Sequence, residues 1–303
     1  MENKELLLSI CIPTNGVVEW VVPVIESIYA QGVDNALFEV VITDNGDKDD
    51  LQEAVKKYDY PNLNYSRNNS KGFTNQIDAF EKCQGVFCKM LNHRSKMLPG
   101  SIIKIISVIN RYKEEKPIIY FSNGLIHGAR FIECANINDF VDTLGVRASW
   151  SAGTGVWNSD INNIDMSIVD TTFPHTYFLF GIRQNSKYII WNDAYFNMQD
   201  ETGKGGYDVF DAFAVRYLKL INKLEINKRI SINTFSNVKM DVFKFLCSLY
   251  LNEVLLPTKN TFIIQNVYKS INVYYNWFYY LIMVFWAYVM FTLIRIKKTI
   301  HRE

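Results

Sequence analysis

The sequence lacks an excess of charge of either sign. Lys and Arg number 32 against 31 Asp and Glu, which gives a formal net charge of +1 at pH 7. A balance this even provides no overall field that would attract a polyanion, so nucleic acid is not an expected partner. With 49% apolar residues over 303 positions, the composition is that of a folded protein with one large domain and an appendage, or with two modest domains.

Closely spaced cysteines are also lacking. Only two of the five are near neighbours, at a spacing unusual for a zinc site. We expect all of them to be small buried side chains in a reducing compartment, without a metal or redox role: Cys11, Cys83, Cys88, Cys134 and Cys247. The first apolar run, residues 6–13, is too short for a secretory signal sequence, which favours a cytoplasmic location for the body of the protein.

The glycine-rich phosphate loops are missing as well. Nicotinamide and flavin enzymes carry G-x-G-x-x-G after their first strand, whereas this chain has Pro13-Thr14-Asn15-Gly16 there. The glycines of residues 153–155 and 203–206 lack a strand–turn–helix context, and no P-loop is present. These absences argue against both dinucleotide-binding and P-loop folds.

What the sequence does contain is an alternation of short apolar runs with amphipathic segments. Apolar runs of this kind are typical of strands buried in a parallel sheet. The pattern predicts strands at residues 6–13, 38–44, 63–66, 86–91, 118–122 and 188–191, and helices at residues 21–29, 73–83, 99–112, 207–224 and 234–250. The expected fold class is therefore α/β, with a mixed, mainly parallel sheet flanked by helices.

Polar clusters follow four of these predicted strands. They are Pro13-Thr14-Asn15, Asp44-Asn45, Arg67-Asn68-Asn69 and Asn92-His93-Arg94. Since ligands of such sheets bind beyond the carboxyl ends of the strands, these clusters predict a binding site.

The same segments, in this order, resemble the nucleotide-sugar-binding region of the family 2 glycosyltransferases, which have the GT-A fold. The resemblance covers residues 6–115 well and the next hundred loosely. It implies a GT-A domain over residues 1–225, with a nucleotide-sugar-binding half at 1–115 and an acceptor half at 116–225. It also implies a nucleotide-sugar donor, most simply a UDP-sugar.

By this resemblance, the strand-end clusters are candidate donor contacts. The predicted nucleotide-sugar-binding residues are Pro13, Thr14, Asn15, Asp44, Asn45, Arg67, Asn68, Asn92 and His93. A carboxylate such as that of Asp44 accepts from a base N–H or a ribose hydroxyl. The alternative is that Asp44 and Asn45 only form the turn after the strand at residues 38–44 and do not contact the donor.

The chain departs from the family at the metal-binding D-x-D motif, where it has Asn92-His93-Arg94. In the usual site a carboxylate holds Mg²⁺ or Mn²⁺, which neutralises the departing diphosphate. Arg94 instead offers a fixed positive fork suited to phosphate oxygens. Three outcomes stay open: metal-free transfer with Arg94 and Lys96 assisting departure, a weakened metal site, or a dead enzyme. We favour the first.

An inverting transfer also needs a base to deprotonate the acceptor hydroxyl. By the family's order, the corresponding stretch is residues 170–175. His175 titrates near neutrality and is the first candidate, and Asp170 is the second. A structural histidine is the alternative.

The C-terminal region, residues 226–303, is predicted to be a helical extension (226–269) followed by an apolar helix with a basic tail (270–303). Residues 270–294 carry no charge, and residues 277–294 would form a helix of roughly 27 Å, near the thickness of a hydrocarbon core. Arg295, Lys297, Lys298 and Arg302 follow, as at a cytoplasmic membrane boundary. Because a full span would separate this tail from the catalytic domain, an in-plane or re-entrant helix is expected at residues 270–298. A packed core helix or a dimer helix is the alternative.

Together these features predict a glycosyltransferase at the cytoplasmic face of the cell membrane, which adds a sugar to a lipid-linked surface-glycan acceptor. One rival is an inactive GT-A-like binding or assembly subunit. A nucleotidyltransferase is a second rival, but it would carry a glycine-rich, lysine-bearing loop that residues 13–18 lack.

Overall fold

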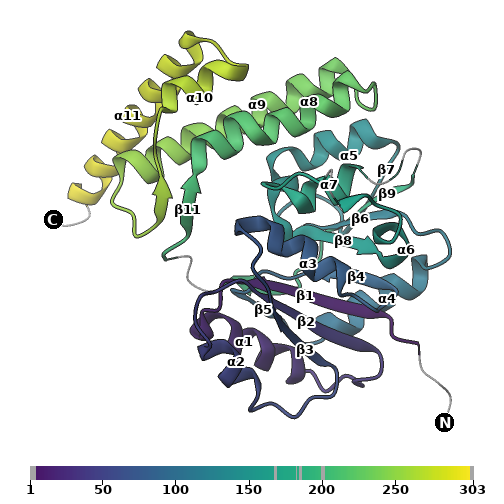
Figure 1. Ribbon diagram of the computed structural model, residues 1–303. Helices are drawn as coiled ribbons and strands as arrows, with labels where there is room; N and C mark the ends of the chain where they lie inside the picture. The colour runs from purple at the N-terminus through teal and green to yellow at the C-terminus, as the bar shows by residue number, and fades with distance from the viewer. Residues whose placement is uncertain (1–4, 167–168, 182, 184–185, 199–201, 301–303) are drawn as a thin grey trace. The chain divides into compact units, whose positions relative to one another are not determined.

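The computed structural model describes residues 5–166, 169–181, 183, 186–198 and 202–300 (Figure 1). Arg302 of the predicted basic tail lies outside these residues. The chain divides into two compact units. Unit 1 comprises Met1–Phe140 and Arg147–Asp200, and unit 2 comprises Val141–Val146 and Glu201–Glu303.

Unit 1 is built on an eight-stranded sheet in the order β3-β2-β1-β4-β8-β6-β9-β7. Strands β3, β2, β1 and β4 are parallel, β8 runs antiparallel to both β4 and β6, and β7 runs antiparallel to β9. The bounds are β1 Leu8–Thr14, β2 Phe38–Asp44, β3 Leu63–Arg67, β4 Phe87–Met90, β6 Ile118–Phe121, β7 Phe131–Cys134, β8 Thr154–Trp157 and β9 Tyr188–Trp191. The predicted mixed, mainly parallel sheet is confirmed. Six of its strands match predicted ones closely, whereas β7 and β8 were not predicted.

The two faces of this sheet follow from the alternation of side chains along its strands. Leu8, Ile10 and Ile12 of β1 point to one face and pack with α1 and α4, whereas Cys11 points to the other face, toward α3 and α7. Both faces are therefore covered by helices, as a nearly continuous apolar strand requires. The helices of unit 1 are α1 Val18–Tyr29, α2 Asp50–Val55, α3 Asn75–Glu81, α4 Ser101–Tyr112, α6 Asn158–Ile161 and α7 Pro174–Gly181, with 3₁₀ turns at η1 Gly72–Thr74 and η3 Ser151–Gly153.

Sequence patterns missed the shorter elements. A second sheet pairs β5 (Ser95–Met97) with β10 (Phe196–Met198), and α5 (Ile137–Leu144) and η2 (Gly145–Ser149) follow β7. β5 and β10 have three residues each, which are too few for a period-two pattern to stand out.

Unit 2 contains most of the helical C-terminal region. Its elements are β11 Gly205–Asp208, the π-helix η5 Asp211–Tyr217, α8 Leu218–Ile226, α9 Ile232–Leu249, the π-helix η6 Tyr250–Leu255, β12 Thr261–Ile263, α10 Val267–Tyr274 and α11 Trp277–Ile300. Strand β11 pairs with β12, and α8 packs on α9. Residues 205–226 therefore group with unit 2, whereas the sequence placed the end of the first domain at residue 225. Tyr207 belongs to β11 rather than to the helix predicted to begin there.

Candidate functional site

Three strand ends are held together by one buried asparagine. Asn75, the first residue of α3, donates from Nδ2 to the backbone carbonyls of Thr14 (3.0 Å) and Thr43 (2.8 Å). Its carbonyl accepts from the Thr43 hydroxyl, and its Oδ1 accepts from Asn68 Nδ2 at 2.7 Å. Asn75 thus connects the carboxyl ends of β1, β2 and β3. Nothing in the sequence singled out this residue, because it lies inside a predicted helix.

Asp44 is the charged centre of this edge and is fully buried. Its Oδ1 accepts from the Gly46 amide at 2.8 Å, and its Oδ2 accepts from the Tyr65 hydroxyl at 2.7 Å. Burial, followed by the hydrogen bond to Asp44, raises the pKa of Tyr65 well above its usual range. The carboxylate is therefore fixed in place and held next to a neutral donor.

Two glycines let the backbone approach this carboxylate. A Cβ at Gly16, whose φ is +81°, would lie 3.0 Å from Asp44 Oδ1. A Cβ at Gly46 would lie 2.4 Å from the Asn15 carbonyl oxygen, closer than real contacts allow. The loops after β1 and β2 therefore pack directly against each other around Asp44.

Arg67 ends β3 and spans the same edge. Its guanidinium pairs with the Asp49 carboxylate and donates to the Gly46 carbonyl. Asn45 Nδ2 donates to the Ser70 carbonyl at 2.8 Å, which ties the loop after β2 to the loop after β3. The half-buried Pro13 and the exposed Asn15 flank Thr14 in the chain.

The turn at the D-x-D position brings His93 and Arg94 to the same edge. Asn92 Oδ1 accepts from the Arg94 amide at 2.9 Å and shapes the turn. His93 Nδ1 lies 3.1 Å from Thr14 Oγ1, and burial, with the Arg94 charge second, lowers the pKa of His93 to about 4. His93 is therefore neutral near pH 7.

Arg94 is stacked on an aromatic ring that the sequence did not single out. Its guanidinium carbon lies 3.3 Å from the centroid of the Trp20 ring in α1, and the residue is only 6% exposed. The Trp20 and His93 rings are 5.2 Å apart. Such stacking fixes the plane of a guanidinium.

The residues at this turn do not fit a divalent metal ion. Asn92 uses its carbonyl oxygen within the turn, His93 contacts Thr14, and Arg94 adds a positive charge. Within residues 5–166, 169–181, 183, 186–198 and 202–300, no three His, Cys, Asp or Glu side chains gather in a way that could hold a metal. A hard cation prefers charged oxygens, which this turn lacks.

The two candidate bases lie near the start of α7: His175 is its second residue, and Asp170 precedes the helix by four residues. Asp170 Oδ1 accepts from the amides of Thr172 and Phe173, each at 2.8 Å, and its side chain is half-buried. His175 is 4% exposed, with Nδ1 2.8 Å from Gln76 Oε1 and Nε2 2.7 Å from the Ser149 carbonyl oxygen. Burial lowers the pKa of His175 to about 4. Both of its nitrogens are engaged by protein atoms, so this placement gives its role as base no support.

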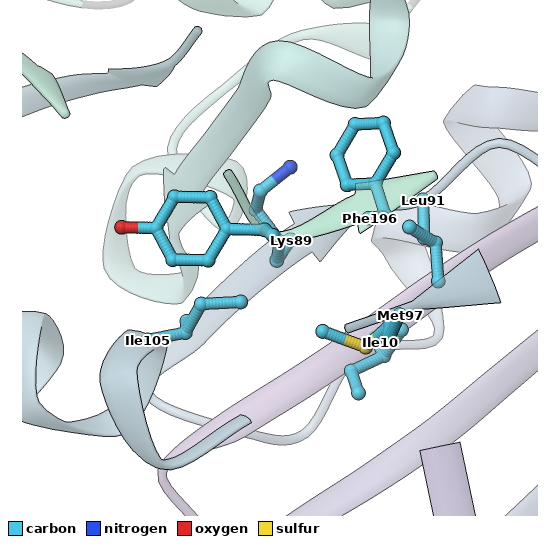
Figure 2. Close-up of a pocket in the computed structure, with 7 residues that line it drawn as sticks. Ile10, Lys89, Leu91, Met97, Ile105 and Phe196 are labelled. Atoms are coloured by element: carbon cyan, nitrogen blue, oxygen red, sulfur yellow. The ribbon is translucent and has the colours of Figure 1, made fainter. Parts of the chain in front are cut away.

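A small cavity lies on the α4 side of the sheet and does not extend the site. It has a volume of about 10 Å³, which is room for roughly one water molecule. Figure 2 shows Lys89 among apolar lining residues such as Ile10, Met97 and Ile105. Lys89 Nζ donates to the carbonyls of Met90 (2.8 Å) and Ala152, and burial lowers its pKa to about 7. Lys89 therefore anchors the end of β4, directly before the Asn92–Arg94 turn.

Comparison with known proteins identifies a family that the first part of the chain matches. Residues 9–119 match the family described as Glycosyl transferase family 2, which confirms the resemblance and the enzyme class predicted from the strand-end motifs. No curated protein sequence matches the chain.

Solved structures of Staphylococcus aureus TarS are similar in fold. A complex of TarS residues 1–349 with UDP-GlcNAc has a TM-score of 0.61 and 14% identity, and the match covers 82% of this chain and 76% of that one. The structure described simply as that of TarS 1–349 has a TM-score of 0.57 and 14% identity, with 82% and 75% coverage. At this identity the likeness shows the fold alone, and it confirms the GT-A-type architecture.

Proposed function

We propose, on the premise that this chain is a family 2 glycosyltransferase, that it moves a sugar from a UDP-sugar to a hydroxyl of a lipid-linked surface-glycan acceptor. TarS, whose fold the chain shares, is described in complexes with UDP-GlcNAc and with UDP, which supports a UDP-sugar as the donor. The nucleotide would lie over the carboxyl ends of β1 and β2. Asp44 would accept from the base, and Thr14, Asn45 and Arg67 would border the nucleotide.

The observation that carries this proposal is the stacked Arg94 at the position of the D-x-D motif. The delocalised positive charge of Arg94 lies at the motif position where other family members bind a metal ion. When the bond between the anomeric carbon and the diphosphate breaks, negative charge develops on the departing oxygen. A guanidinium already fixed by Trp20 stabilises that charge without reorganising. We therefore propose metal-free transfer, with Asn92 and His93 shaping the turn.

For the other half of the reaction we propose Asp170 as the base, ahead of His175. An inverting transfer requires a base that removes the acceptor proton as the hydroxyl oxygen attacks the anomeric carbon. The Asp170 carboxylate is half-buried in the segment that leads into α7, whereas His175 is enclosed and holds two protein partners. Asp170→Asn should abolish transfer while leaving UDP binding intact. His175→Gln should act mainly on stability, and a selective loss of transfer in that variant would reverse the assignment.

The first test is turnover of a panel of UDP- and GDP-sugars, with and without EDTA. We expect hydrolysis or transfer of a UDP-sugar at a rate that EDTA does not change. A rate that EDTA abolishes would contradict the metal-free reaction. No turnover of any donor would favour the binding or assembly subunit.

We also propose that α11 attaches the protein to the membrane by lying in its plane. One stripe of the helix packs inside unit 2, where Met283 and Ala287 are fully buried. The opposite side exposes a row of large apolar residues: Trp277, Phe278, Leu281, Ile282, Phe285, Trp286, Tyr288, Val289, Leu293 and Ile296. The helix partners of this stripe, α9 and η6, carry charges such as Lys244 and Glu253, which a spanning α11 would draw toward the hydrocarbon.

Flotation with phospholipid vesicles tests this attachment. Phe285 is 72% exposed, and its transfer into lipid contributes about 1.5–3 kcal/mol, so Phe285→Ser should weaken vesicle binding at least about tenfold. Ile103→Ser, a matched change at a 52% exposed position of α4, should leave binding unchanged. Because Arg295 and Lys297 adjoin the apolar row, anionic vesicles should bind better than zwitterionic ones. A wild-type chain that binds neither kind, but self-associates through α11, would show a dimer helix instead.

A further inference from the structure

Three of the five cysteines, distant in sequence, converge on the α3 face of the sheet. Cys11 comes from β1, Cys88 from β4, and Cys83 lies two residues after the end of α3. All three belong to one buried cluster with Phe80 and Met90. Cys11 Sγ and Cys83 Sγ are 3.0 Å apart, and both residues are thiols here. The sequence predicted inert, separate cysteines, and their convergence is a property of the fold.

The surroundings of these thiols are polar on one side. Ser9 Oγ donates to Glu39 Oε1 at 2.6 Å and accepts from the Gly85 amide at 2.9 Å. The Gln84 amide donates to the same Glu39 oxygen at 2.7 Å. Cys83 thus begins a short chain segment that is tied to the sheet by hydrogen bonds, and this segment keeps its sulfur next to Cys11.

The two cysteine residues differ in exposure to solvent. Cys11 is fully buried, whereas Cys83 is 8% exposed and lies between the exposed Lys82 and Gln84. A small oxidant arriving from solvent therefore reaches Cys83 first. Cys11 stands behind it, within 3.0 Å.

We propose that Cys83 and Cys11 are a peroxide-sensitive pair that closes to a reversible disulfide. The Cys83 thiolate attacks one oxygen of hydrogen peroxide, which gives a sulfenic acid on Cys83 and releases hydroxide. The Cys11 thiol then attacks the Cys83 sulfur, a sulfur–sulfur bond forms, and water leaves with the Cys11 proton. The peroxide supplies the oxidising equivalents for the two thiols, and a dithiol reductant reverses the change.

The ionisation of the pair agrees with this division of roles. Burial alone would raise the pKa of Cys83, but hydrogen bonds with Cys11 and Cys88 outweigh it and hold the pKa below its usual range. Burial, and then the neighbouring Cys83, raises the pKa of Cys11 well above its usual range. Of the two thiols, the less deeply buried Cys83 therefore gives up its proton more readily, and the thiolate is the nucleophile toward peroxide.

A disulfide bond requires a sulfur–sulfur distance of about 2 Å, so the two atoms must approach by about 1 Å. The bond would fasten the end of α3 to β1. The first residue of α3, Asn75, holds the carbonyls of Thr14 and Thr43 at the donor edge. The disulfide would thus join α3 and β1, two of the elements that form the proposed nucleotide-sugar site. The proposal does not depend on which nucleotide-sugar is the donor.

Peptide mapping of the full chain by mass spectrometry tests the proposal. The protein is treated with hydrogen peroxide, its remaining thiols are alkylated in denaturant, and the digest is analysed with and without dithiothreitol. We expect a Cys11–Cys83 cross-linked peptide that the reductant separates. Cys11→Ser should leave a Cys83 sulfenic acid that dimedone traps, and Cys247→Ser, at a buried site in unit 2, should still form the cross-link.

The cross-link is measured in the wild-type protein, so the test remains valid even if one of the variants fails to fold. Two alkylatable thiols at Cys11 and Cys83 after peroxide would overturn the proposal. So would a link from Cys83 to Cys88, or oxidation of Cys83 to the sulfinic acid without a link. Because no activity is measured, failure here is distinct from failure of the proposed sugar transfer.

Discussion

Arg94→Ala should lower the kcat of sugar transfer about 100- to 1,000-fold, since a single fixed group that stabilises developing charge contributes that much to an enzymatic rate. The guanidinium is held 3.3 Å above the Trp20 ring and is 6% exposed, so its position before the reaction is already set. Loss of the side chain leaves the diphosphate without its proposed counter-charge, while Asp44 and the nucleotide contacts remain. The KM for the donor should therefore change less than kcat.

The measurement is steady-state transfer with the donor found in the panel, in the presence of EDTA. Arg94→Lys should recover only part of the rate, because an ammonium neither stacks nor presents a planar fork. Lys104→Ala, which removes an exposed positive charge from α4, is the matched control and should behave as wild type. An Arg94→Ala enzyme with unchanged kcat would rule out a role for the guanidinium in departure of the diphosphate.

The sheet could be predicted from the sequence because its central strands are buried on both faces. Residues 38–44 and 86–91 are nearly continuous apolar runs, and they became β2 and β4 with their polar residues at the carboxyl ends. The positions of Thr14, Asp44 and the Asn92–Arg94 turn follow from this, since parallel neighbours end at one edge. The contact between Thr14 and His93 is a consequence of that order.

The side chains that hold the site in place could not be predicted in this way. Trp20, Tyr65 and Asn75 act through contacts with Arg94, Asp44 and Thr14, which lie 21 to 74 positions away in the chain. None of those pairings leaves a local pattern. His175 is a residue that the sequence did single out, but in a role that its surroundings do not support. Its chemistry suggested a base, but only the structure shows that Gln76 and Ser149 enclose it. The pairing of β11 with β12, both in unit 2, is likewise not encoded by sequence periodicity.

Asp44→Asn should weaken binding of UDP about 10- to 100-fold, since a hydrogen bond to a charged acceptor contributes about 1.5–3 kcal/mol. The substitution keeps the shape of a fully buried side chain but removes its charge and one acceptor oxygen. Gly46 and Tyr65 both donate to the carboxylate, so the amide cannot satisfy them and the base together. The loss should therefore appear in binding, before any chemistry.

Isothermal titration of UDP measures this directly, with thermal unfolding of the same samples as a check on folding. Tyr65→Phe is the matched control, because it removes the hydroxyl bonded to Asp44 Oδ2 and keeps the carboxylate charge. If the base and Tyr65 compete for that oxygen, the Tyr65→Phe protein should bind UDP at least as tightly as wild type. Weak binding in both variants would mean that the Tyr65–Asp44 pair supports the loop rather than the ligand. Wild-type affinity in a folded Asp44→Asn protein would place the uracil elsewhere.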